Sequence, residues 1–314
     1  MTGNPSKSLA RLAWLTLGFN LIVILGGAVV RATGSGAGCG AHWPTCNGEV
    51  IPPSPTMATL IEYSHRTTSG LALILVALLL QQVWRRIERG QLARFWAAAS
   101  MLLILGEAAI GAGLVLFERV AGDTSTARGF WISGHLVNTF LLIAALVLTA
   151  RFLDQPRRVD GEGFVASLRS TFPGMRGNHA AAFAVVAMFA IGVSGAIAAL
   201  GDTLFKASSL TEAIAQDFSS TSHIFLRLRI LHPVIALIGG GLLLFIAHRV
   251  ITTNTHRPVA RNRGLRLAGL VVAQWFVGLV NLLLLAPTWL QLVHLLVADF
   301  IWLVLILVIA DEPR

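Results

Sequence analysis

Four histidines are spaced in a way that could bind metal-centred cofactors. His65 and His232 lie 167 positions apart, His135 and His294 lie 159 apart, and all four stand near the start of long apolar runs. One histidine in such a run is more often a packing residue, but four at repeated positions favour ligation. Two imidazoles that face each other across a helix bundle leave room for a flat macrocycle, so the spacing predicts axial ligands of haem iron. Copper is disfavoured because no Cys or Met ligand is arranged around these histidines.

A carboxylate distinguishes the first pair of histidines from the second. Glu62 stands three residues before His65, on the same helical face, whereas Arg229 stands three residues before His232. An electron carrier has no need of such a carboxylate. Beside a haem that is itself being altered, it could take protons or stabilise positive charge. The alternative is that Glu62 is a solvated residue at a helix start, favoured there by the helix dipole.

Arginines near the same helix ends could pair with haem propionates. Arg66 is the candidate next to His65. The other candidates are Arg31, Arg128, Arg227 and Arg229. The alternative is that these arginines only flank the helices.

The composition is that of an integral, all-α membrane protein. Of 314 residues, 55% are hydrophobic and 12% are charged, and the mean hydropathy is +0.73. That leaves too little polar surface to enclose a soluble core. The apolar runs are continuous rather than alternating, which favours helices over a barrel. Eight of them are long enough to cross about 30 Å of hydrocarbon: 12–31, 61–84, 95–117, 131–151, 180–200, 229–250, 265–286 and 288–309.

The distribution of charge predicts how these helices are oriented. The net charge of +9 could suggest nucleic acid, but all except seven of the 24 Lys and Arg residues fall on one side of the predicted membrane. That side is cytoplasmic by the positive-inside rule. Both chain ends are then cytoplasmic, and the four histidines lie toward the outer face of the cell membrane, about one helical turn into it. The first apolar run is expected to be a permanent helix rather than a cleaved signal peptide.

Near-constant offsets between motifs indicate an internal duplication. Gly27 and Gly195 lie in similar runs of small residues 168 positions apart, and Glu107 and Gln274 each stand four residues before a glycine, 167 positions apart. Small residues let helices approach closely. Together with the histidine offsets, these spacings predict two four-helix halves related by an axis along the membrane normal. The expected ranges are 1–155 and 177–314, joined by a cytoplasmic linker at 156–176.

The two cysteines, Cys39 and Cys46, lie in the first outer loop. An outer loop is an oxidising environment, so a disulfide is expected. It could staple the loop or act as a redox-active pair. A weak metal site with His42 is the third alternative, although ligands are lacking.

Two further carboxylates, Glu107 and Asp299, lie within the apolar runs. Each could relay protons or make a hydrogen bond inside the bundle, and a structural role is favoured for both. The remaining histidines fall in loops or at helix ends and are expected to be solvated: His42, His179, His223, His248 and His256.

Taken together, these motifs resemble those of the haem A synthase family. They are Arg31-Ala32-Thr33-Gly34-Ser35-Gly36, the loop Cys39…Trp43-Pro44-Thr45-Cys46, Glu62-Tyr63-Ser64-His65-Arg66, Gly134-His135, Leu231-His232-Pro233 and Val293-His294. The resemblance spans all eight predicted helices. It implies oxidation of a ring methyl of haem O to a formyl group, through a hydroxymethyl stage, giving haem A for terminal oxidases. Haem O synthase and cytochrome oxidase assembly proteins would be partners.

The resemblance also implies roles for individual residues. His65 and His135 would bracket the substrate haem O in the first half. His232 and His294 would hold a permanent haem b in the second. Glu62 would be the catalytic carboxylate.

Two departures from the family pattern stand out. The segment 201–228 lacks the second cysteine pair of some bacterial members, and Glu107 occupies a position where the family leads us to expect Gln. The first pair, Cys39 and Cys46, would place the chain in the group whose cysteines assist turnover.

Two other functions fit parts of the pattern. A di-haem electron carrier of the cytochrome b kind would have the same bis-histidine bundles, but it would have no reason for Glu62. A transporter would need a polar path through the middle of the membrane, and only Glu107 and Asp299 offer one.

Overall fold

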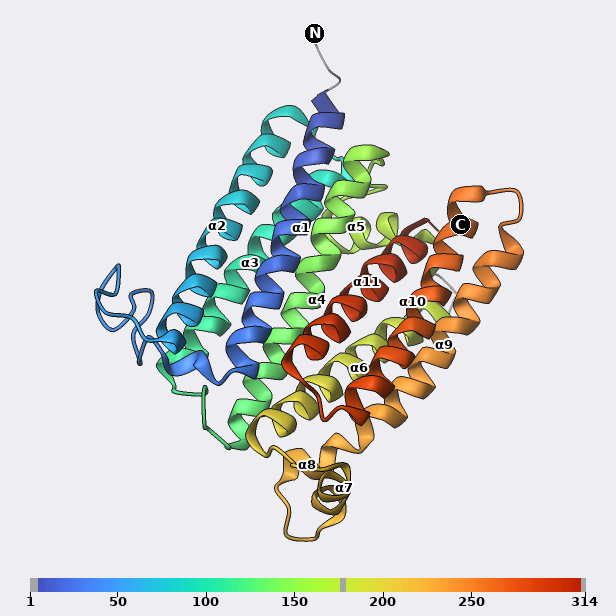
Figure 1. Cartoon of the computed structure of the whole chain (residues 1–314). Helices are drawn as coiled ribbons and strands as arrows, with labels where there is room; N and C mark the ends of the chain where they lie inside the picture. The colour runs from blue at the N-terminus through green and yellow to red at the C-terminus, as the bar shows by residue number, and fades with distance from the viewer. Residues whose placement is uncertain (1–4, 176–178, 312–314) are drawn as a thin grey trace.

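The computed structural model describes residues 5–175 and 179–311, and the fold within those ranges is all-helical, with no strand. Eight long helices dominate it (Figure 1). They are α1 (Pro5–Ala32), α2 (Met57–Arg86), α3 (Leu92–Leu116), α4 (Thr126–Asp154), α6 (His179–Leu204), α9 (Leu231–Thr253), α10 (Pro258–Leu283) and α11 (Thr288–Asp311). In the described part of the chain, eight helical segments are long and apolar enough to cross a membrane. The eight helices predicted from the sequence are confirmed, and they suit a multi-pass membrane protein.

The helices that carry His65 and His135 begin earlier than their apolar runs. Thr56 caps α2 by accepting the Thr59 backbone N–H at 3.2 Å, and Ser125 caps α4 in the same way. Such caps satisfy backbone donors that the first helical turn leaves free. His65 therefore lies eight residues into its helix, which is about two turns rather than the single turn expected from hydropathy.

The chain packs as two groups of helices, and the pattern of contacts in the first group recurs in the second. In the first group, α1 contacts α2 and α4, and α3 also contacts α2 and α4. In the second group, α6 contacts α9 and α11, and α10 also contacts α9 and α11. The groups meet along α1, α4, α6 and α11. This arrangement agrees with the proposed duplication, in which α1 corresponds to α6 and α2 to α9.

Aromatic side chains fill the contact between the two groups. Trp302 of α11 is 1% exposed, stacks on Phe140 of α4 with 5.4 Å between ring centroids, and donates its indole N–H to the Phe140 carbonyl at 2.6 Å. Phe189 of α6 packs edge-on against Trp302. A buried indole gains most when its N–H also finds an acceptor. The core between the groups is thus packed and hydrogen-bonded at the same point.

Three short helices were not predicted. α5 (Gly163–Thr171) lies within the expected linker and is held against α3 by a hydrogen bond from Trp96 to the Thr171 hydroxyl at 2.9 Å. α7 (Leu210–Phe218) and α8 (Ile224–Arg229) lie between α6 and α9. The expected boundary between linker and second half, at 176–177, falls outside the described residues.

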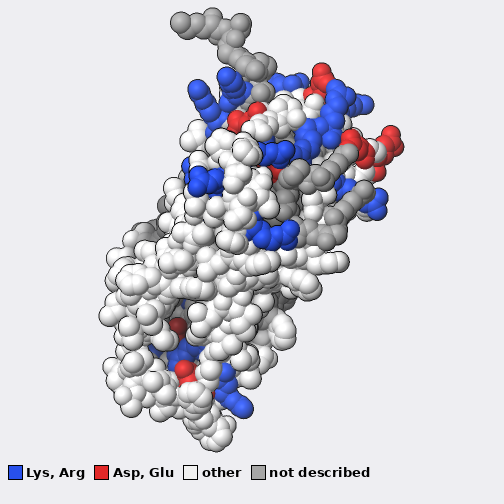
Figure 2. Space-filling view, turned by 90° about the vertical axis from the view of Figure 1, so that its right-hand side faces the viewer, with Lys and Arg blue, Asp and Glu red and all other residues white. Residues whose placement is uncertain are grey.

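The two ends of the helix bundle differ in charge. Lys and Arg side chains gather at the upper end in Figure 2, which we call the basic end. There Arg151 and Arg263 both pair with Asp311 of α11. The opposite end carries the loop with Cys39 and Cys46, as well as α7 and α8 (Figure 1), and we call it the disulfide end. The chain ends that the sequence predicts to be cytoplasmic, 1–4 and 312–314, lie outside the described residues.

Candidate functional site

His65 of α2 lies against the backbone of α1. A Cβ added to Gly27 would stand 3.1 Å from the His65 ring, and one added to Gly26 would stand 3.4 Å from its Nδ1. Glycine at these positions lets the imidazole approach the neighbouring helix closely. The sequence predicted a close approach of helices here. It did not indicate that a histidine ring fills the space.

His232 has the corresponding neighbours in the second half. A Cβ added to Gly195 of α6 would stand 2.9 Å from the His232 ring. The Ser194 hydroxyl lies 3.1 Å from His232 Nδ1, and the opposite ring nitrogen, Nε2, takes no part in this contact. A histidine whose Nδ1 is held by a hydrogen bond has its ring orientation fixed, as in metal-ligating imidazoles.

His294 of α11 completes the second pair. The ring centroids of His232 and His294 are 6.3 Å apart, with an interplanar angle of 84°. His294 also packs over Gly278 of α10, where an added Cβ would stand 3.1 Å from the ring. Metal–imidazole bonds are about 2.0–2.1 Å long, so the separation of the rings accommodates a metal centre between them.

His135 of α4 has a different neighbour from His294. Its Nδ1 lies 2.7 Å from Oε2 of Glu107 on α3. Oε1 of the same carboxylate accepts hydrogen bonds from the Asn138 amide at 2.8 Å and from the Thr139 hydroxyl at 3.0 Å. The sequence favoured a structural role for Glu107, and the contact with a candidate ligand was not foreseen.

The surroundings of the histidines fit the haem expected from the sequence. Nδ1 of His65 and Nδ1 of His294 are buried and have no hydrogen-bond partner in the described structure. Such unpartnered nitrogens are costly unless a ligand or another group satisfies them. Among the described residues, no three His, Cys, Asp or Glu side chains cluster as a metal-ion site.

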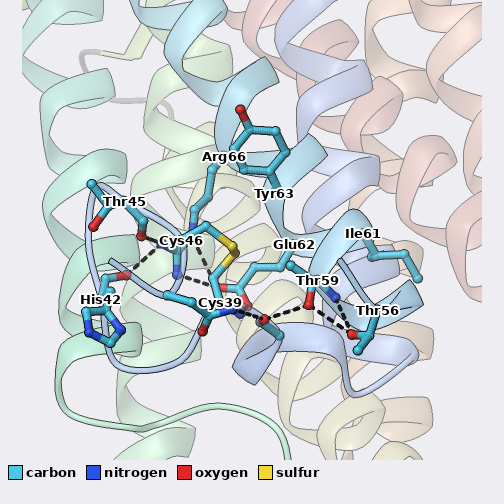
Figure 3. The surroundings of a disulfide bond; sticks show 12 residues. Cys39, His42, Thr45, Cys46, Thr56, Thr59, Ile61, Glu62, Tyr63 and Arg66 are labelled. Carbon is cyan, nitrogen blue, oxygen red and sulfur yellow. Dashed lines mark hydrogen bonds and ion pairs between the residues drawn. A yellow bond between two sulfur atoms is a disulfide. The ribbon is translucent and has the colours of Figure 1, made fainter. Parts of the chain in front are cut away.

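Glu62 is buried and fixed by two partners (Figure 3). It is 3% exposed. Its Oε2 accepts the backbone N–H of Cys39 at 2.9 Å, and its Oε1 pairs with the Arg66 guanidinium at 2.5 Å. A solvated helix-start residue would be exposed, so that alternative for Glu62 is wrong. The carboxylate instead joins α2 to the disulfide loop.

Arg66 holds the same loop from one helical turn further along. Its Nη1 donates to the carbonyls of His42 and Thr45, at 2.6 and 2.7 Å (Figure 3). Its remaining nitrogens donate to Glu62. Pairing with a propionate therefore stays a prediction, and in this structure it would require Arg66 to share these donors.

The Cys39–Cys46 disulfide expected from the sequence is present, with an S–S distance of 2.00 Å. Both half-cystines are buried, at 0% and 1% exposed. The loop passes close to the start of α2, where a Cβ on Gly38 would stand 2.4 Å from backbone atoms of Ala58. Only glycine fits there, and the Thr59 hydroxyl donates to the Gly38 carbonyl at 2.9 Å. The loop is thus fitted closely to the end of α2.

Arg229, which stands three residues before His232, anchors the segment between α6 and α9. Its guanidinium pairs with Asp202 of α6 at 2.6 Å and with Asp217 of α7 at 2.6 Å, and it donates to the Ala213 carbonyl at 3.2 Å. Glu62 and Arg229, which each stand three residues before a candidate histidine, therefore each secure a loop, one through a carboxylate and the other through a guanidinium. Near the disulfide end, the face of the molecule drawn in Figure 2 has a hollow that contains residues of both charges.

Arg31 links the two groups of helices. It leaves the end of α1 and donates to the Ala199 carbonyl at 2.8 Å and to the Thr203 hydroxyl at 3.1 Å, both on α6. It also donates to the Gln291 side chain of α11 at 2.9 Å. Gln291 stands three residues before His294. No sequence pattern could have identified these partners, because they are 168 to 260 positions away.

The remaining candidates occupy varied positions. Arg128 is 2% exposed and donates to the Ala121 and Asp123 carbonyls, so it also secures a loop at the disulfide end. His223 caps α8 rather than being free in solvent. Asp299 is fully buried on α11, and neither carboxylate oxygen has a hydrogen-bond partner among the described residues.

Comparison with known proteins places the chain in a family. It matches the COX15-CtaA family, described as cytochrome oxidase assembly protein, over residues 10–306. A protein of Thermus thermophilus named protoheme IX farnesyltransferase is 43% identical over 300 residues, which is 95% of this chain but 47% of that protein. Proteins named heme A synthase are 40% identical over 126 residues in Alkalihalophilus pseudofirmus and 43% identical over 145 residues in Shouchella clausii.

The chain spans about half the length of the curated relatives it matches. The shares covered are 47% of the Thermus protein, 42% of the Alkalihalophilus protein and 46% of the Shouchella protein. The family match extends over nearly all of this chain, from before the middle of α1 to near the end of α11. The chain therefore belongs to the COX15-CtaA family of cytochrome oxidase assembly proteins.

Proposed function

We propose that this chain is a haem A synthase, which oxidises a ring methyl of haem O to a formyl group to give haem A. The single observation that carries the proposal is the buried carboxylate of Glu62, three residues before His65, at a position where the second half has Arg229. Family membership and the relatives named heme A synthase support it.

In this proposal each half holds one haem. His65 and His135 bracket haem O as the substrate in the first half, and His232 and His294 hold haem b in the second. Haem b supplies electron transfer when it is bound. The unpartnered nitrogens of His65 and His294 and the close approach of glycines to three of the rings support these assignments.

The proposed reaction proceeds in two oxidations at the same methyl carbon. Each removes two electrons and two protons, and water supplies the oxygen of the new group in the first. The electrons leave by way of the second haem to an external electron acceptor. Glu62 accepts protons released at the first site. Its contacts with Arg66 and Cys39 fix the carboxylate in place, so that little reorganisation is required when charge develops nearby.

The proposed location is the cell membrane, with the basic end in the cytoplasm and the two haems toward the outer face. The gathering of Lys and Arg at the basic end supports this orientation. The lipid bilayer is then the solvent of the long helices. Haem O synthase and other cytochrome oxidase assembly proteins are the proposed protein partners.

Prenyl transfer is the second function that a relative's name raises. The chain covers only 47% of the Thermus protein, so the activity named for that protein can reside in the rest of it.

One experiment separates the candidates. The chain is expressed in membranes supplied with haem O, purified, and its haem extracted for chromatography and absorption spectroscopy. Haem A together with haem b is the expected result. Unaltered haem throughout would identify a di-haem electron carrier, and absence of any haem would contradict the proposal. Farnesylation of haem b, in a parallel sample supplied with haem b and farnesyl diphosphate in place of haem O, would identify a prenyl transferase.

A further inference from the structure

Glu107 is held by a network that points one of its oxygens at His135. Asn138 and Thr139 of α4 both donate to Oε1, at 2.8 and 3.0 Å. Oε2 is left facing His135 Nδ1 at 2.7 Å. The Asn138 amide also donates to the Leu103 carbonyl of α3 at 2.8 Å, which fixes the amide itself. The carboxylate is therefore oriented by two side chains of the helix that carries His135.

The second half has none of these groups at the corresponding positions. With the offsets of the proposed duplication, Glu107 corresponds to Gln274, and Asn138 and Thr139 correspond to Val297 and Ala298. The Gln274 amide lies 3.3 Å from His294 Nε2 and donates to the His294 carbonyl at 3.0 Å. Whether its oxygen or its nitrogen faces His294, the Gln274 amide brings no full negative charge to the imidazole ring.

A carboxylate that accepts the second N–H of a metal-bound imidazole makes that imidazole a stronger electron donor. Stronger donation stabilises the oxidised iron and lowers its reduction potential. From the 2.7 Å contact and the missing counterparts in the second half, we infer that Glu107 tunes the first site. Acting through His135, it gives the haem held there a lower reduction potential than the haem held by His232 and His294.

The inference rests on the proposed function, because it requires His135 to be an axial ligand of the substrate haem. It adds to that function the direction in which electrons move between the two haems. Electrons released at the first site would pass downhill to the haem of the second. Glu107 is a positioning and tuning residue in this account, since it touches the ligand rather than the haem.

The test is an anaerobic redox titration of the purified protein loaded with haem O and haem b, followed by visible absorption. Two reduction steps are expected in the unmodified chain, the lower belonging to haem O. Glu107→Gln, which keeps shape and removes charge, should shift the haem O step upward toward the haem b step and leave the haem b step in place. An unshifted haem O step, with haem O still bound, would overturn the inference.

The reciprocal substitution is the matched control. Gln274→Glu should lower the haem b step alone, because it places a carboxylate beside His294. Thr139→Ala removes one of the two donors that orient Glu107 and should raise the haem O step by less than Glu107→Gln does. Loss of haem O from both Glu107→Gln and Thr139→Ala, with no shift in what remains, would assign Glu107 a purely structural role.

Failure of the underlying function would look different. His135→Ala should abolish the haem O spectrum of a bis-histidine site. If that spectrum survives in His135→Ala, the ligand assignment falls and the tuning falls with it. If the haem O spectrum is lost in His135→Ala while Glu107→Gln leaves the haem O reduction potential unchanged, the proposed function stands and only the tuning by Glu107 is wrong.

Discussion

The carboxylate of Glu62 accepts the backbone N–H of Cys39 at 2.9 Å, so the candidate catalytic residue and the disulfide are one hydrogen bond apart. The loop is tied to α2 a second time by Arg66, which binds both Glu62 and the carbonyls of His42 and Thr45. A change in the loop therefore reaches the carboxylate directly.

Removing the Glu62 side chain should cost both activity and stability. Glu62→Ala leaves the partly buried Arg66 guanidinium with the His42 and Thr45 carbonyls but without its carboxylate partner, and it leaves the Cys39 N–H without an acceptor. An unsatisfied donor of this kind costs about 1–3 kcal/mol. Haem A formation should be lost and thermal unfolding should occur at a lower temperature.

Glu62→Gln separates the two effects, because an amide can still accept the Cys39 N–H. It should lose haem A formation with a smaller fall in unfolding temperature. The exposed Glu49 of the same loop provides the control, and Glu49→Ala should match the unmodified chain. Full activity of Glu62→Gln would remove the carboxylate from the mechanism.

Opening the disulfide should destabilise the protein by about 2–3 kcal/mol, the usual value for a loop of this length. The measurement is thermal unfolding with and without a reductant. The double variant Cys39→Ser and Cys46→Ser should unfold at the lower temperature in both buffers. A reductant that lowers its unfolding temperature further would show that the effect does not come from this bond.

Filling the space beside His232 should empty the second site. The Cβ of Gly195→Ala would stand 2.9 Å from the ring, and overpacking of this kind costs about 1–3 kcal/mol. We expect a lower content of haem b in the purified protein, measured from absorption spectra. Gly241→Ala is the control in the same half, since nothing lies within 4 Å of its added Cβ. Equal haem b content in the two variants would contradict the assignment of His232.

Truncating Arg31 should weaken the contact between the two groups of helices. Hydrogen bonds from a charged donor are worth about 1.5–3 kcal/mol each, and Arg31→Ala removes those to Ala199, Thr203 and Gln291. The unfolding temperature should fall clearly, whereas Arg227→Ala, which truncates an exposed arginine, should change it little. An unchanged unfolding temperature in Arg31→Ala would mean that these bonds add nothing to stability.

Hydropathy and spacing were sufficient to predict the eight long helices and the candidate ligands. Each run of apolar residues is a local property of the chain, and in hydrocarbon a helix is the structure that satisfies its own backbone. The predicted starts of α2 and α4 were several residues too late, because Thr56 and Ser125 cap polar turns that precede the apolar runs. α5, α7 and α8 were missed because helices this short depend on contacts such as Trp96 with Thr171 and Arg229 with Asp217.

By itself the sequence determined the helical membrane fold and the difference between Glu62 and Arg229, and its near-constant offsets predicted which histidines correspond. Only the tertiary structure decided what those side chains touch. Glu62 meets Cys39 across 23 positions, Glu107 meets His135 across 28, and Arg31 reaches Gln291 across 260. The periodicity of a helix fixes which face a residue occupies, but the neighbour on that face depends on how whole helices pack, and packing is set by the entire chain.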